Sequence, residues 1–333
     1  SMEITGAVVA LDSTEAVVEE AIRNNCNLVI AHHPIVFSGL KKFTGKNYVE
    51  RTIIKAIKND IAVYAIHTNL DNVQAGVNAM IAKKLSLKNT RILSPKENLL
   101  RKLVTFCPKT EAEKVRNALF EAGAGAIGNY DECSFNAEGT GTFRGNEQTN
   151  PYVGEKGKRH LENEERIETI YPQHLEGRIL AALRASHPYE EIAYDIYPLL
   201  NKWQQVGSGM TGETETVFSL EDFLAHVKRS LAVPVIRYTP VEGKKVKKVA
   251  VCGGSGSFLL NDAIRAGADV FITADYKYHQ FFDGDGKIVV MDVGHFESEQ
   301  FTIQLLADFL KQKFPTFAVR QTGVNTNPIT YYT

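Results

Sequence analysis

The chain has 333 residues, and its 44% hydrophobic and 23% charged content allows two globular domains with buried cores. The 38 basic and 39 acidic residues leave a formal net charge of -1, so composition gives no support to nucleic acid or a membrane surface as a partner. Four isolated cysteines (Cys26, Cys107, Cys133 and Cys252) and the lack of an apolar run long enough to cross a bilayer favour a cytoplasmic protein with reduced thiols.

The first elements predict a parallel β-sheet. The apolar, β-branched run 4–11 is a predicted strand, and residues 14–24 show apolar positions at helical spacing after a cap supplied by Asp12-Ser13. A second apolar strand follows at 28–30. Uniformly apolar strands joined by a helix are typical of a parallel pair that is covered on both faces. The second strand ends in Ala31-His32-His33-Pro34, which places two imidazoles where the chain leaves the sheet.

The next segment repeats this plan. A polar loop and a predicted helix at 48–58 lead to an apolar strand at 61–66, and that strand ends in His67-Thr68-Asn69-Leu70-Asp71. A further helix is predicted at 76–85. Each strand therefore delivers ligand-type side chains at its carboxyl end, where the sites of α/β sheets form.

The middle of the chain has a different pattern, which predicts an inserted module. Strands are predicted at 103–106, 139–145, 166–171 and 193–197, and helices at 111–122 and 174–185. This βαβ-βαβ order is that of a ferredoxin-like α+β fold. The polar, glycine-containing stretch 146–165 is predicted to be a solvated loop or hairpin tip.

The α/β pattern resumes near Trp203. The predicted elements are a strand at 247–251, a glycine turn at 252–257, a helix at 258–266, strands at 270–272 and 287–291, and a final helix at 300–313. We therefore predict an α/β fold in which residues 2–98 and 206–333 form one discontinuous domain. Residues 99–205 form the inserted domain.

The two parts of the α/β domain are related by an internal duplication. Residues 21–33 match residues 263–275 at a single offset, and Ala-Ile-Arg opens both segments. His33 and Asp275 therefore occupy equivalent strand ends. We interpret the domain as two βαβ halves that face each other across a pseudo-twofold axis and surround one site.

Each half also reaches a strand end where a histidine precedes a carboxylate by four residues. These pairs are His67 with Asp71 and His295 with Glu299. Four residues is one helical turn, so the two side chains of each pair face the same way if a helix has begun.

Five of these strand-end residues form a candidate metal site: His32, His33, Asp71, His295 and Glu299. Three imidazoles and two carboxylates suit zinc, iron, manganese or nickel better than calcium or magnesium. Five protein ligands exceed the four of a closed zinc site and fit two divalent ions that share a carboxylate, for which Asp71 is the candidate. Because adjacent strand residues point to opposite faces, His32 and His33 are expected to serve different ions. Such a pair of ions activates water for hydrolysis.

Other polar residues have competing interpretations. His67 is predicted to be a hydrogen-bonded residue beside the ligands, Glu299 could serve only the helix dipole, and Asp275 and His279 could be a cap and a surface residue. His67, Asp275 and His279 are nevertheless the candidates for catalytic proton transfer, since a general base must lie within one hydrogen bond of the attacking water. The remaining histidines are predicted to be structural: His160, His174, His187 and His226.

Two glycine-rich stretches carry weaker signals. Residues 207–212 satisfy G-x-G-x-x-G, but no clear strand ends there and an extended segment follows, so a nicotinamide or flavin site is not expected. The turn at 253–257 stands between a strand and a helix, and its amides could hold an anion. It lacks the lysine of a P-loop, and a plain tight turn is at least as well supported.

With Ala-His-His-Pro at 31–34, His-Thr-Asn-Leu-Asp at 67–71, Thr-Ala-Asp-Tyr-Lys-Tyr-His at 273–279 and Gly-His-Phe-Glu-Ser-Glu at 294–299, the sequence resembles the Nif-three-like dinuclear-metal proteins. These are often labelled GTP cyclohydrolase 1 type 2 homologues. The resemblance covers essentially the whole chain. It implies the same five metal ligands, a PII/CutA-like identity for the inserted domain, and assembly into a toroidal homohexamer.

Residues and resemblance together lead us to expect a dinuclear-metal-dependent hydrolase, of the cyclohydrolase or phosphoester type, that acts on a nucleotide-like small molecule. The rival expectation is a non-enzymatic metal-binding or regulatory hexameric scaffold. Members of that family usually begin with a further helix and an Asp-Asn-x-Gly segment, which implies a shortened start here. Many also carry arginine where this chain has Met210, so an anion contact is not expected at that position.

Overall fold

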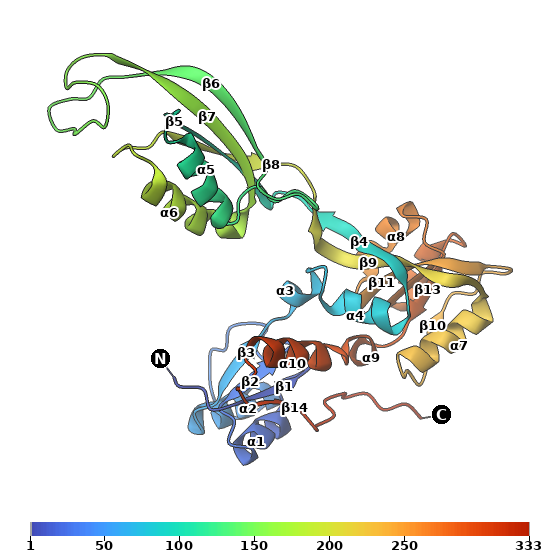
Figure 1. Ribbon diagram of the computed structural model, residues 1–333. Helices are drawn as coiled ribbons and strands as arrows, with labels where there is room; N and C mark the ends of the chain where they lie inside the picture. Colours follow the sequence, from blue (N-terminus) through green and yellow to red (C-terminus); the bar gives the residue numbers. More distant parts are fainter. Residues whose placement is uncertain (1, 333) are drawn as a thin grey trace. The chain divides into compact units, whose positions relative to one another are not determined.

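The computed structural model describes residues 2–332 (Figure 1). The chain divides into two compact units. One consists of the residues up to Pro95 together with those from Gln204 onward, and the other of Lys96–Trp203. Within residues 2–332, no helix combines the length and the apolar character that a membrane span requires. The boundaries at 99 and 205, which the sequence suggested for two separately folding domains, remain a prediction.

The first sheet of the larger unit is fully parallel, as the sequence predicted. Its strand order is β14 (Val319–Gln321), β1 (Ala7–Ala10), β2 (Leu28–Ala31) and β3 (Ala62–Ala65). Val8 and Val29 pack with α1 (Glu15–Arg23) and α2 (Tyr48–Lys58), whereas Val9 and Ile30 pack with α10 (Thr302–Lys313). Alternate residues thus bury both faces, which explains why these strands are apolar throughout.

The second sheet of this unit has six strands. Its order is β10 (Arg237–Tyr238), β13 (Val289–Asp292), β12 (Val270–Ala274), β11 (Lys245–Ser255), β9 (Trp203–Ser219) and β4 (Lys88–Lys96). The three central strands β11, β12 and β13 are parallel, whereas β9 runs antiparallel to β11 and β10 runs antiparallel to β13. Helices α4 (Val77–Lys84) and α7 (Leu220–Ser230) cover one face, while α8 (Leu260–Arg265) and the 3-10 helices η2 (Ser257–Leu259) and η3 (Tyr278–Gly284) lie on the other.

The predicted duplication is visible in the strand registers. Ala7 pairs with Leu28 in the first sheet, and Val249 pairs with Val270 in the second, so the partner follows at the same sequence spacing in both. Both triplets, β1-β2-β3 and β11-β12-β13, are parallel and run in the same order. A short helix follows the last strand of each: α3 (Thr68–Asp71) after β3 and α9 (His295–Glu299) after β13. The α/β fold with duplicated βαβ halves is therefore confirmed.

Two neighbouring strands, β4 and β9, were not predicted from residues 88–96 and 207–212. Most of β4 is exposed and polar, so it lacks the apolar alternation of a half-buried strand. The glycines of β9 serve its close approach to β4, because a Cβ at Gly207 would lie 2.2 Å from the Ser94 carbonyl oxygen. The G-x-G-x-x-G match therefore lies inside a strand, away from any strand-to-helix turn that could hold a dinucleotide.

The smaller unit is an antiparallel sheet with two helices. The sheet order is β6 (Ser134–Phe143), β7 (His160–Pro172), β5 (Leu100–Pro108) and β8 (Tyr194–Leu199). Side chains of α5 (Ala112–Glu121) and α6 (Glu176–Ser186) share one buried core with the sheet, and the 3-10 helix η1 (Gln173–Leu175) precedes α6. This topology is that of a ferredoxin-like sheet. A PII/CutA-like identity remains a prediction.

The predicted loop at 146–165 is too long. Strand β7 begins at His160, which pairs with Phe143 of β6, so the pairing of the hairpin continues beyond the region that packs against the helices. Charged residues are tolerated there because the outer part of the hairpin is largely exposed. Only the tip between the two strands is irregular.

Candidate metal centre

His32 and His33 lie immediately beyond the end of β2. Their backbone N–H groups donate to the carbonyl oxygens of Ala10 (3.2 Å) and Leu11 (2.9 Å), which holds this corner against β1. The centroids of the two imidazole rings are only 4.8 Å apart. The expectation that the rings point to opposite faces is therefore wrong. Strand alternation stops at Ala31, where the strand ends.

His67 and Asp71 come from the end of β3 and from α3. His67 has a φ of 41°, in the left-handed region that L side chains rarely adopt, and its N–H donates to the His32 carbonyl oxygen at 2.8 Å. The centroid of its ring lies 5.8 Å from that of His32 and 5.7 Å from that of His33. Asp71 places Oδ1 3.4 Å from His32 Nε2. His67 thus has an unfavourable backbone conformation, and its ring lies beside those of the other two histidines.

His295 and Glu299 occupy the two ends of α9. The Glu299 Oε2 atom lies 3.1 Å from His295 Nε2, as their four-residue spacing predicts. The Glu299 side chain is buried against the last residues of β11, where the pairing of β11 with β12 is irregular. Gly254 of β11 has a φ of 61°, and a Cβ there would lie 2.3 Å from Glu299 Oε1. Glycine at this position therefore makes room for the carboxylate.

The amides of Gly253 and Gly254 in β11 already have partners within the protein. Gly253 N–H donates to Asn78 Oδ1 (3.0 Å), and Gly254 N–H donates to Ser298 Oγ (2.9 Å). The turn predicted at 252–257 begins later than expected, because β11 continues to Ser255. These two amides are not free to bind an anion.

The five predicted ligands converge as two groups around Glu299. Its Oε1 atom lies 3.8 Å from His32 Nε2, which also faces Asp71. Its Oε2 atom lies 2.9 Å from His33 Nε2, and the Nε2 atoms of His33 and His295 are 3.2 Å apart. Ligands about 2.0–2.2 Å from one tetrahedral ion lie about 3.3–3.6 Å from each other. The distances within the two groups, from 2.9 to 3.8 Å, lie on both sides of this range. Glu299, and not Asp71, has the central position expected of a shared carboxylate.

Two further carboxylates orient the histidines from behind. Asp12 Oδ1 accepts a hydrogen bond from His33 Nδ1 (2.8 Å), and Asp275 Oδ2 accepts one from His295 Nδ1 (2.7 Å). Each carboxylate follows the strand next to the one that carries its histidine. Such a bond fixes the ring and leaves Nε2 available to a metal ion. Asp275 is therefore placed to hold His295, and it too has a positive φ of 58°.

Buried polar atoms without partners test whether the residues fit a cation. Among residues 2–332, the buried atoms that lack a hydrogen-bond partner include both ring nitrogens of His32 and Oδ1 of Asp71. His32 is 0% exposed. Leaving such groups unpaired costs about 1–3 kcal/mol each, and an ion held by His32 Nε2 and Asp71 Oδ1 would remove that cost for these two atoms. These atoms, the ligand types and their spacing fit a metal ion.

The electrostatics of the cluster also favour positive charge. Burial opposes the charged form of His33, but hydrogen bonds to Asp12 and Glu299 outweigh it and raise the pKa of His33 to about 9. The hydrogen bond to Glu299, aided by Asp275, raises the pKa of His295 to about 9. Burial raises the pKa of Asp71 to about 6. The three histidines lower the pKa of Glu299 against the effect of its burial.

Two cavities adjoin the cluster. The first, of about 350 Å³, is lined by His33, His67 and His295 together with apolar and aromatic side chains that include Phe37 and Tyr48. The second, of about 230 Å³, shares His295 with the first and is also lined by Asp275 and Arg237. Burial lowers the pKa of His67, which favours a neutral ring that can accept a proton. A small molecule in the first cavity would lie between the histidines and the aromatic rings.

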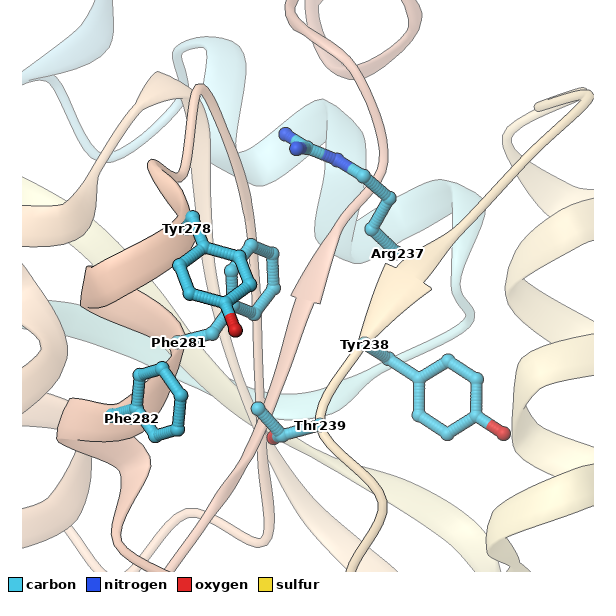
Figure 2. A pocket seen from close by; sticks show the side chains of 6 residues that line it. All are labelled: Arg237, Tyr238, Thr239, Tyr278, Phe281 and Phe282. Carbon is cyan, nitrogen blue, oxygen red and sulfur yellow. The ribbon is translucent and has the colours of Figure 1, made fainter.

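His279 is not brought to the cluster. It is exposed, and its ring lies edge-on to that of Tyr278 with centroids 5.2 Å apart. Figure 2 shows the neighbouring cavity, of about 250 Å³, where the rings of Tyr278, Phe281 and Phe282 face the strand that carries Arg237. None of the six residues lining that cavity is a predicted metal ligand. A catalytic role of His279 therefore has no geometric support within this chain.

Asp12 is the functional candidate that the sequence did not reveal. We predicted it as a helix cap, but Thr14 caps α1 by accepting a hydrogen bond from the Val17 N–H. The available signal was the position of Asp12 directly after a buried strand, the same signal that marked Asp275. Its partner His33 lies on the next strand, so no local spacing connects the two.

Comparisons with known proteins find relatives over nearly the whole chain. Residues 1–328 match the family model of Duf34/NIF3 (NGG1p interacting factor 3). The chain is 41% identical over 334 residues to a GTP cyclohydrolase 1 type 2 homolog of Halalkalibacterium halodurans, covering 98% of this chain and 90% of that protein. It is 40% identical to a Bacillus subtilis protein of the same name, covering 98% and 89%. A crystal structure of a Bacillus cereus protein related to NIF3 matches with a TM-score of 0.88 at 40% identity, covering 100% and 90%.

Proposed function

The chain belongs to the Duf34/NIF3 family, and from that premise we propose that it is a dinuclear-metal-dependent hydrolase of a nucleotide-like small molecule. The central position of the Glu299 carboxylate carries the proposal. One oxygen faces His32, and the other faces His33 and His295, so this carboxylate could be shared by two divalent ions. Zinc or iron is the expected metal, with manganese or nickel as the alternatives that this donor set allows.

The proposed ligands are His32, His33, Asp71, His295 and Glu299. When bound, two such ions supply an activated water and stabilise negative charge that develops on a substrate oxygen. Asp12 and Asp275 hold the rings of His33 and His295 in place through their Nδ1 atoms. His67 lines the cavity with a neutral ring and is placed to take up a proton from the attacking water.

The shape of the first cavity and the names of the relatives together indicate the substrate class. Phe37 and Tyr48 offer aromatic surface for a planar ring within reach of the histidines. Relatives with about two fifths of their residues identical are named GTP cyclohydrolase 1 type 2 homologs. We therefore propose opening of a heterocyclic ring or cleavage of a phosphoester in a nucleotide-like molecule.

Metal content and turnover test this proposal together. The purified protein is analysed for metal per subunit and then assayed with GTP and with a panel of phosphoesters. We expect two ions per subunit and turnover that His33→Ala abolishes. The matched control is His174→Ala, which removes an exposed histidine of the other unit and leaves metal content unchanged.

The rival is a metal-binding or regulatory scaffold without catalysis. Two bound ions with no turnover of either substrate class would favour that scaffold over a hydrolase. Assembly is tested separately by light scattering, which should give the homohexamer that the family resemblance implies. A monomer in solution would contradict that part of the proposal.

A further inference from the structure

The chain continues beyond β14 as a tail without helix or strand, residues 322–332 (Figure 1). This tail is nevertheless tied to the body of its unit by side-chain hydrogen bonds. The first contact of the tail is with Glu20 of α1. The Glu20 carboxylate accepts hydrogen bonds from the Thr322 hydroxyl and from the Gly323 N–H (2.9 Å). The path of the tail then leads to the candidate metal centre.

Thr326 contacts the carboxylate that orients His33. The Thr326 hydroxyl donates to Asp12 Oδ2 at 2.6 Å, while Asp12 Oδ1 accepts the hydrogen bond from His33 Nδ1 at 2.8 Å. Both oxygens of Asp12 are therefore engaged, which fixes the rotation of its carboxylate. Asp12 has a one-third exposed side chain, so without Thr326 it could turn toward solvent.

Asn327 contacts the helix that carries the other ligands. Its Nδ2 donates to Glu297 Oε1 at 3.0 Å, and its Oδ1 accepts a hydrogen bond from the Ile329 N–H at 3.0 Å. Glu297 lies in α9, between His295 and Glu299, and is only 5% exposed. The tail thus reaches the second half of the duplicated frame one residue after it reaches the first.

We propose that Thr326 and Asn327 are positioning residues that clamp the two halves of the frame together at the metal cluster. Thr326 acts through Asp12 on His33, at the end of the first sheet. Asn327 acts through Glu297 on α9, at the end of the second. The inference rests on the proposed function only in that the cluster must bind metal.

The same residues form part of the cavity wall. Asn327 and Ile329 line the cavity of about 350 Å³, and Ile329 also lines the cavity of about 230 Å³. The tail is therefore placed to affect both metal binding and access to the cluster. These two effects separate experimentally, because metal affinity is measured without substrate.

Matched threonine variants test the clamp in the full-length protein. Zinc affinity is measured by competition with a chromogenic chelator for Thr326→Val, Thr326→Ser and Thr322→Val. We expect Thr326→Val to weaken zinc binding on the order of tenfold, since losing a residue that supports a metal ligand typically costs 10–100-fold. Thr326→Ser keeps the hydroxyl and should restore the affinity. Thr322→Val removes a tail hydroxyl that contacts Glu20 and not Asp12, so it should leave the zinc affinity unchanged.

Either of two results would overturn the proposal. One is wild-type zinc affinity in Thr326→Val. The other is an equal loss in Thr322→Val, which would mean that any loosening of the tail has the same effect. Thermal unfolding of each metal-free variant shows whether it is folded.

A second pair of variants tests the other half of the clamp. Asn327→Asp places a carboxylate opposite Glu297 and should weaken zinc binding more than Asn327→Ala does, because like charges repel. Equal affinities in the two variants and the wild type would refute the role of Asn327. A protein that binds zinc but hydrolyses nothing would end the hydrolase proposal and leave the clamp standing. A protein in which the cluster binds no metal would refute both.

Discussion

The two units each bury histidines, but in opposite ways. In the smaller unit, His187 Nε2 donates to the Phe106 carbonyl oxygen (3.0 Å) and Nδ1 accepts from the Tyr189 N–H (3.1 Å). In the larger unit, His33 donates a hydrogen bond from Nδ1 to Asp12, and its Nε2 atom faces Glu299 and His295. A ring with both nitrogens bonded to backbone is part of the packing. A ring oriented by a carboxylate on one side, with acidic and imidazole neighbours on the other, presents a metal ligand.

Among the variants that test this contrast, a substitution of Glu299 is expected to have the largest effect on zinc affinity. Glu299→Ala removes the carboxylate that both ligand groups share, so zinc affinity should fall by more than about a hundredfold, beyond the range of a supporting residue. Isothermal titration of the metal-free protein measures the loss. Glu190→Gln in the smaller unit is the control and should bind zinc normally. Retention of both ions by Glu299→Ala would mean that the cluster is held together for another reason.

Smaller losses are expected when the orienting carboxylates are changed. Asp12→Asn and Asp275→Asn should each lower zinc affinity about 10–100-fold, because each weakens a hydrogen bond that fixes a ligand ring. Asp12→Asn should have the larger effect, since the side chain of Asp12 is 33% exposed and that of Asp275 is 48% exposed. Competition titrations on both variants decide the order. Wild-type affinity in both would remove Asp12 and Asp275 from the site.

The smallest effect concerns His187 and is read in stability. Burial lowers the pKa of His187 below its ordinary value of 6.5, although the Phe106 carbonyl oxygen opposes this shift. The unfolded chain therefore binds the proton more readily than the folded one. The stability due to neutral His187 is present above about pH 6.5 and is lost as the pH falls through that value toward the folded pKa. Denaturant unfolding at a series of pH values, followed by the fluorescence of the single tryptophan, Trp203, measures it.

His187→Ala is the variant that isolates this response. It should lower the free energy of unfolding by about 1–3 kcal/mol at neutral pH, since two partly buried backbone groups lose a partner. It should also flatten the dependence on pH below 6.5. After chelator treatment, the stability contributed by the candidate metal cluster should depend on pH in the opposite direction. His33 and His295 have pKa values raised to about 9, so their contribution is present below pH 6.5 and is lost as the pH rises through 9.

The sequence located the predicted metal ligands because each lies at a strand end that local pattern reveals. His32 and His33 follow an uninterrupted apolar run, and His295 precedes Glu299 by one helical turn. The duplication added independent support, since it aligned His33 with Asp275. Local pattern and spacing were therefore sufficient for the parallel sheet and for the candidate ligands.

The sequence failed where the decisive neighbour is distant along the chain. It proposed Asp71 as the shared carboxylate, whereas packing of α9 against Gly254 of β11 gives the central position to Glu299. Strands β4 and β9 escaped notice because an exposed edge strand and a glycine-rich strand lack apolar alternation. Asp12 looked like a cap because its histidine lies on another strand.

Taken by itself, the sequence determined the α/β class, the duplicated frame and the strand ends that carry the candidate ligands. Periodicity and spacing within an element can be read from the sequence without knowledge of the fold. Only the tertiary structure decided which carboxylate lies between the histidines, which ones orient them, and that Thr326 and Asn327 of the tail reach both halves. These are contacts between segments brought together by burial of the two sheets, and no local pattern encodes their distances.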